Sequence, residues 1–92
     1  MEEKKNEIEK IQELLEEKNI NELRKLINEL NSVDISGIFE ELSEELDKEK
    51  LLIAFRILKK KKAGEVFSYL SPEMQEKLIV HLTDTEIRNV IN

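Results

Sequence analysis

Apolar residues recur along the chain every three to four positions, which is typical of amphipathic helices. In the segment from Glu3 to Glu17 the apolar residues fall on one helical stripe, and Glu and Lys fill most other positions. That stripe consists of Ile8, Ile11, Leu14 and Leu15. Lys18 and Asn19 end the pattern, and a second helix is predicted from Ile20 to Leu30.

Two further helices are predicted in the middle of the chain. Asn31 and Ser32 offer side-chain oxygens that can cap a third helix, and Asp47 can cap a fourth. The third helix has a full-width apolar stripe of Ile35, Ile38, Phe39 and Leu42. The fourth carries Leu51, Leu52, Phe55 and Leu58.

The last part of the chain predicts three more helices. A fifth follows the lysine run 59–62 with Ala63, Val66, Phe67 and Leu70 inward. Ser71 and Pro72 form a strong start signal for a sixth, which carries Met74, Leu78, His81 and Leu82. Thr83 and Glu86 have capping-box spacing for a seventh, with Ile87, Val90 and Ile91 inward. With only two glycines and one proline in the chain, the predicted fold is all-α.

The sequence also contains an internal repeat of a helix pair. Residues 37–39 and 42–43 correspond to residues 65–67 and 70–71 at an offset of 28, and residues 49–53 correspond to 76–80 at an offset of 27. Helical-pair units that cannot bury their apolar faces alone stack on their neighbours into an armadillo-like superhelix. Such arrays usually present a surface to a partner.

Length and charge narrow the classes of function. The 92 residues are 39% hydrophobic and 39% charged, which indicates one small domain over 1–92. The net charge of −6 argues against nucleic acid as a partner, because phosphate binding requires a basic face. The charge is polarised, since residues 1–46 hold 14 acidic and 6 basic side chains while residues 47–92 hold 7 and 9. The longest apolar run is the five residues from Leu51 to Phe55, so we expect no membrane span in this chain and a cytoplasmic location.

No catalytic constellation is evident, and no enzyme activity is predicted. The chain has no cysteine and a single histidine, His81, which we expect to border the core or to complement a helix dipole. Gly37 and Gly64 occupy equivalent positions in the third and fifth helices, where close helix packing explains them better than a phosphate loop does. The lysine run is typical of a solvated helix start, with contact to anionic lipid as the alternative.

Carboxylates are dense between residues 40 and 47. This group consists of Glu40, Glu41, Glu44, Glu45 and Asp47. Hard cations take oxygen ligands, and Mg2+ keeps several waters and needs only one or two carboxylates. The acidic helical face is therefore a weak candidate for a cation site, or simply a solvated surface.

From Leu14 to Asn92 the sequence resembles the cytosolic N-terminal domain of MgtE-type magnesium transporters. The residues that carry the resemblance lie in order and with fitting spacing in five blocks: Leu23-Arg24-Lys25-Leu26-Ile27, Asp34-Ile35 with Phe39-Glu40-Glu41-Leu42, Ala54-Phe55-Arg56-Ile57-Leu58, Ala63-Gly64-Glu65-Val66-Phe67-Ser68-Tyr69-Leu70-Ser71-Pro72-Glu73, and Gln75-Glu76-Lys77-Leu78-Ile79. The resemblance implies a right-handed superhelix of short helices that precedes a pair of CBS domains and a membrane pore. It also implies a Mg2+ sensor, in which ions bridge acidic side chains of this domain and the CBS domains and favour the closed pore.

Within that resemblance, one metal ligand is carried over to this chain. The glutamate of the family's Ala-Ala-Glu-Val motif falls on Glu65, and the family's other acidic contacts lie on a helix that would begin beyond Asn92. Mg2+ is therefore expected to bind weakly here without the missing domains. The implied partners are the CBS domains and the membrane domain of the same transporter, with the isolated chain monomeric and the full-length family dimeric. The histidine-proline of the family's first helix pair is replaced here by Asn31-Ser32, which keeps the cap but loses the proline.

A different class of function is kept as the alternative. The helical repeats also look similar to those of the flagellar motor switch protein FliG, and on that interpretation the chain is a free-standing protein interaction module for which the cation is irrelevant. For Glu65, the alternative to a metal ligand is an exposed helix residue near the lysines.

Overall fold

Seven α-helices make up most of the computed structural model, which describes residues 2–91 of the chain and contains no strand in that range. The helices are α1 (Glu2–Glu16), α2 (Ile20–Glu29), α3 (Ser32–Glu45), α4 (Lys48–Arg56), α5 (Lys60–Tyr69), α6 (Pro72–Ile79) and α7 (Asp84–Ile91). The predicted all-α fold is confirmed. The fifth helix does not follow the lysine run 59–62, as predicted, but begins inside it at Lys60.

Short polar side chains begin most of these helices, as the sequence predicts. Five of these side chains accept a hydrogen bond from the backbone N–H three residues further on, and they belong to Asn19, Asn31, Asp47, Ser71 and Thr83. Pro72 follows Ser71 at the start of α6, where its missing N–H costs nothing. The end of α1 is fixed by Lys18, which has a φ of 59°, and by hydrogen bonds from the Lys18 and Asn19 N–H groups to the Leu15 and Leu14 carbonyls. This pair of bonds is a Schellman motif, which satisfies the last carbonyls of the helix.

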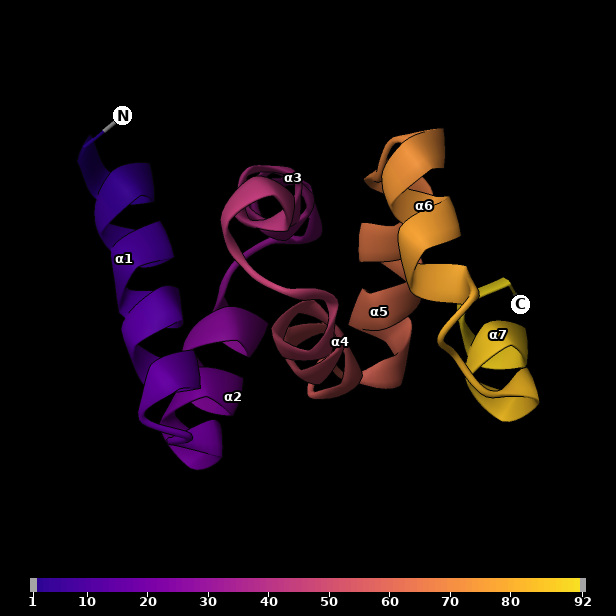
Figure 1. Cartoon of the computed structure of the whole chain (residues 1–92), viewed down its shortest axis with the longest axis horizontal. Helices are drawn as coiled ribbons and strands as arrows, with labels where there is room; N and C mark the ends of the chain where they lie inside the picture. Colours follow the sequence, from indigo (N-terminus) through magenta and orange to yellow (C-terminus); the bar gives the residue numbers. More distant parts are fainter. Residues whose placement is uncertain (1, 92) are drawn as a thin grey trace.

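The helices stack as pairs along one direction, with the two ends of the chain at opposite ends of the molecule (Figure 1). The odd-numbered helices pack in succession, α1 on α3, α3 on α5 and α5 on α7, while α4 packs on α6. This arrangement agrees with the predicted stacking of helix pairs. The right-handed superhelical twist stays a prediction.

The helix boundaries confirm one part of the predicted repeat and correct the other. The N-caps of α3 and α5 are Asn31 and Lys59, which are 28 residues apart, as the first offset requires. The N-caps of α4 and α6 are Asp47 and Ser71, only 24 residues apart, so the offset of 27 does not superpose these helices. The reason is that α3 has 14 residues and α5 has 10, about one turn fewer.

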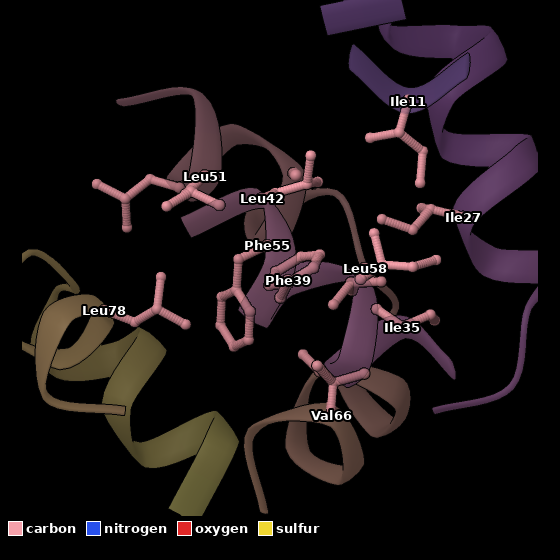
Figure 2. Close-up of a cluster of buried hydrophobic side chains, with 14 of the residues drawn as sticks. Ile11, Ile27, Ile35, Phe39, Leu42, Leu51, Phe55, Leu58, Val66 and Leu78 are labelled. Atoms are coloured by element: carbon pink, nitrogen blue, oxygen red, sulfur yellow. The ribbon is translucent and has the colours of Figure 1, made fainter. Parts of the chain in front are cut away.

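Three phenylalanines of the hydrophobic core, Phe39, Phe55 and Phe67, connect the helix pairs, and Figure 2 labels the first two. The Phe55 ring of α4 lies edge-on to Phe39 of α3, at a centroid distance of 6.2 Å, and edge-on to Phe67 of α5, at 6.3 Å. Edge-to-face contact is a favoured arrangement of aromatic rings at this separation. Phe55 therefore contacts both helix pairs, α3 with α4 and α5 with α6.

At the C-terminal end the structure corrects two expectations. Ile91 is 64% exposed rather than inward, and Ile87 and Val90 are only half-buried, because α7 packs mainly on α5. His81 lies outside α6, which ends at Ile79, and the residue is exposed rather than bordering the core.

Candidate functional site

Glu65 is an exposed residue in the middle of α5, next to the start of α3. Its Oε1 atom accepts a hydrogen bond of 2.7 Å from the hydroxyl of Ser32, which is buried in the first turn of α3. Asn31 alone caps α3 through its side chain, so Ser32 serves a different purpose from the predicted cap. The hydroxyl holds the Glu65 carboxylate against α3 while the residue stays accessible to solvent.

An open groove of about 520 Å³ runs between α5 and α7, and Glu65 lies on its wall. Its lining residues are Lys60, Lys61, Gly64, Glu65, Ser68, Asn89, Val90 and Ile91. Glu65 is the one carboxylate of this lining, and Lys61 stands four residues before it, one helical turn away. The predicted close packing does not explain Gly64, because a Cβ atom there would lie 3.7 Å from the Val90 carbonyl oxygen, an ordinary contact distance that leaves room for a small side chain.

The groove at Glu65 offers a cation only one carboxylate among its lining residues. Across the residues that the structure describes, no group of three or more His, Cys, Asp or Glu side chains is placed to hold a metal ion. One carboxylate binds Mg2+ weakly and leaves most of the coordination shell to water. Glu65 can therefore act as one ligand of a site that is completed by another surface.

The acidic group at residues 40–47 does not converge on one point, since several of its members stabilise the fold. Glu40 accepts hydrogen bonds from the Ser71 backbone N–H, at 2.6 Å, and from the Ser71 hydroxyl, at 3.1 Å, and so ties α3 to the start of α6. Asp47 caps α4, and Glu45 accepts a 2.6 Å hydrogen bond from the side-chain amide of Gln12 in α1. These three carboxylates bind protein groups instead of facing a common cation.

The last lysine of the run has a structural role that sequence patterns did not predict. The Lys62 ammonium group donates hydrogen bonds to the carbonyl oxygens of Asn28, at 2.8 Å, and Leu30, at 2.6 Å. These carbonyls lie at the C-terminal end of α2, where the helix dipole favours a cation. Lys62 therefore docks α5 on α2, and only Lys59, Lys60 and Lys61 remain exposed.

A second long-range contact ties α4 to the start of α7. The Arg56 guanidinium binds both carboxylate oxygens of Glu86, with Nε 2.9 Å from Oε2 and Nη2 3.3 Å from Oε1, and also donates to the His81 carbonyl at 3.2 Å. The predicted capping box is present, because Glu86 accepts from the Thr83 N–H and the Thr83 hydroxyl accepts from the Glu86 N–H. The hydrogen bond from the Thr83 N–H is the largest cause of a lowered pKa of Glu86; desolvation opposes it, and Arg56 lowers the pKa further.

These features together describe an all-α domain of stacked helix pairs, in which several charged residues join neighbouring helices and Glu65 lies exposed on the wall of a groove. The family model described as the MgtE intracellular N domain matches residues 41–92, which is more than half of the chain. The chain belongs to this family, which is a domain family of magnesium transporters. The resemblance seen in the sequence is confirmed for this range, and its earlier part, from Leu14 to Glu40, lies outside the match.

The other comparisons add no relative. No curated protein and no solved structure matches the chain. Each helix among residues 2–91 is too short or too polar to cross a membrane.

Proposed function

We propose that this chain is a Mg2+-sensing regulatory domain of a magnesium transporter, with Glu65 as a cation ligand shared with CBS domains. The observation that carries the proposal is the family match over residues 41–92, which includes Glu65. When Mg2+ is abundant, the ion bridges Glu65 and acidic groups of the CBS domains, and the contact favours the closed pore. When Mg2+ is scarce, facing carboxylates repel each other and the two surfaces separate.

The placement of Glu65 supports this role. The carboxylate is exposed on α5, and one of its oxygens is held by Ser32, which limits the rotamers that have to be ordered on binding. A site completed only when two surfaces meet makes the contact itself depend on the cation, which is the coupling that a sensor requires. Further acidic ligands of the site belong, in this proposal, to the partner.

The test measures association of the 92-residue domain with the CBS domains of an MgtE transporter while Mg2+ is titrated through the millimolar range. Association should strengthen with Mg2+, and Glu65→Gln should remove most of that dependence while leaving the helical circular dichroism unchanged. Glu76→Gln is the matched control, because Glu76 is another exposed glutamate, on α6. Equal responses of the two variants would remove Glu65 from the site.

A protein interaction module without cation dependence is the second candidate. Exposed apolar residues at the C-terminal end of the stack, Val80 and Ile91, favour it, because such positions often contact a partner. Association that is equally strong with and without Mg2+ would support this function over the sensor.

A further inference from the structure

Helix α7 buries fewer apolar side chains than α1, the helix at the other end of the stack. None of the described residues of α7 is fully buried, whereas α1 buries four apolar side chains, Ile8, Ile11, Leu14 and Leu15. The apolar contacts of α7 come from Ile87 and Val90, both half-buried. Burial of apolar area sets most of a helix's docking energy, so α7 depends on other contacts more than α1 does.

The strongest of those other contacts is ionic. Arg56 reaches from α4 and holds two points at once, the Glu86 carboxylate in the first turn of α7 and the His81 carbonyl in the turn before it. The two charged side chains are 45% and 30% exposed, so salt in solution screens their attraction. Lys60 of α5 lines the same small groove as Glu86 and adds a second positive group beside it.

The equivalent junction one repeat earlier is built differently. There the start of α5 is held by Asn28, whose side-chain amide donates to the Ile57 carbonyl and whose side-chain oxygen accepts from the Lys59 N–H. Lys62 adds hydrogen bonds to backbone carbonyls, and α5 also buries Ala63, Val66 and Phe67. That junction combines hydrogen bonds to backbone groups with a buried helix face, while the α7 junction relies on a partly exposed ion pair.

We propose that α7 is a conditionally docked helix, latched to α4 by the Arg56–Glu86 ion pair, which releases as a unit while α1–α6 stay folded. Release opens the groove of about 210 Å³ between α4, α5 and α7, and thereby exposes Phe55, Leu58 and Ala63. Ionic conditions set the balance between the docked and released states. Release also removes the α7 wall of the groove on which Glu65 lies, but it does not require Mg2+.

Amide hydrogen exchange on the full 92-residue chain, in Mg2+-free buffer, tests the proposal. In the wild-type protein the α7 amides should exchange much faster than those of α3 and α5, and added NaCl should accelerate α7 alone. Arg56→Gln and Glu86→Gln should each raise α7 exchange by about three- to tenfold, the range expected when a hydrogen bond of ordinary strength is lost, because solvent screens this partly exposed pair. The double variant should show little further acceleration, since either change alone breaks the latch.

Lys25→Gln provides the control. Lys25 forms an exposed pair with Glu22 on α2 at 4.0 Å, and its loss should leave α7 exchange unchanged. The proposal is overturned if wild-type α7 amides exchange at the same rate as those of α3, or if Arg56→Gln accelerates all helices equally. Either result would mean that α7 opens only by global unfolding.

Discussion

Replacing Phe55 by leucine should destabilise the fold more than the same change at Phe39, although both rings are essentially buried. Phe39 is 0% exposed and Phe55 is 3% exposed, so the two changes remove similar apolar area. Phe55, however, takes part in two edge-to-face contacts and Phe39 in one. Each such pair contributes about 0.5–1.5 kcal/mol beyond its buried area.

The expected difference can be stated as an energy. Leucine in place of phenylalanine costs up to about 1.5 kcal/mol for the change of shape at either site. Phe55→Leu then loses about 1–3 kcal/mol of aromatic contact and Phe39→Leu about half as much. The gap of about 1 kcal/mol is large against a total stability of roughly 5–14 kcal/mol for a chain of this length, and it corresponds to about 4–8 °C in Tm.

Urea unfolding followed by far-ultraviolet circular dichroism measures this gap. The variants should differ in midpoint and share the wild-type slope, which shows that the same surface is exposed on unfolding. Equal midpoints for Phe39→Leu and Phe55→Leu would refute the reasoning, because the second aromatic contact would then contribute nothing. A changed slope for Phe55→Leu alone would mean that the two helix pairs no longer unfold together.

Two further predictions concern single charged residues. Lys62→Ala should destabilise the protein by about 1–2 kcal/mol, because it leaves the Asn28 and Leu30 carbonyls without their donor. Lys61→Ala, at an exposed position, should change stability by less than about 0.5 kcal/mol. The urea unfolding midpoints of the two variants measure this difference. Glu86 has a lowered pKa in the folded state, so its stabilising effect is complete above the unfolded-state value of about 4.3 and is lost as the pH falls through the lower folded-state value. The stability difference between wild type and Glu86→Gln should accordingly shrink below about pH 4, and a constant difference from pH 7 to pH 3 would contradict the assigned role.

Local sequence signals predict the helices of this protein well. Caps and apolar stripes are determined by residues three or four positions apart, so the starts at Asn31, Asp47 and Ser71 follow from short-range chemistry. The offset of 28 between Phe39 and Phe67 is also visible, because both rings occupy the same place in equivalent helices. The offset of 27 misleads, since two short amphipathic helices match almost as well when one is shifted by a turn.

The sequence does not predict which residues of helices far apart along the chain contact each other. Arg56 binds Glu86 across 30 positions and Lys62 binds Leu30 across 32, and no local pattern distinguishes these partners from other acids or carbonyls. The exposure of Ile91 is hidden for the same reason, because its stripe has the helical period whether or not a neighbour covers it. Glu65 was identified through the family resemblance, and its bond to Ser32 required the structure.

The bond from Ser32 also bears on how Glu65 would hold Mg2+. The hydroxyl hydrogen points at Oε1, so a cation on that oxygen would meet a positive partial charge, and displacing the hydroxyl would leave a buried donor unpaired at a cost of about 1–3 kcal/mol. The Ser32 hydroxyl does not bond to Oε2, so a cation can bind there without displacing it. Mg2+ accepts a single oxygen from each carboxylate while it keeps its waters. Coordination through Oε2 alone is therefore the geometry expected at this site, with the Ser32 hydroxyl retained as the group that orients the carboxylate toward its partner.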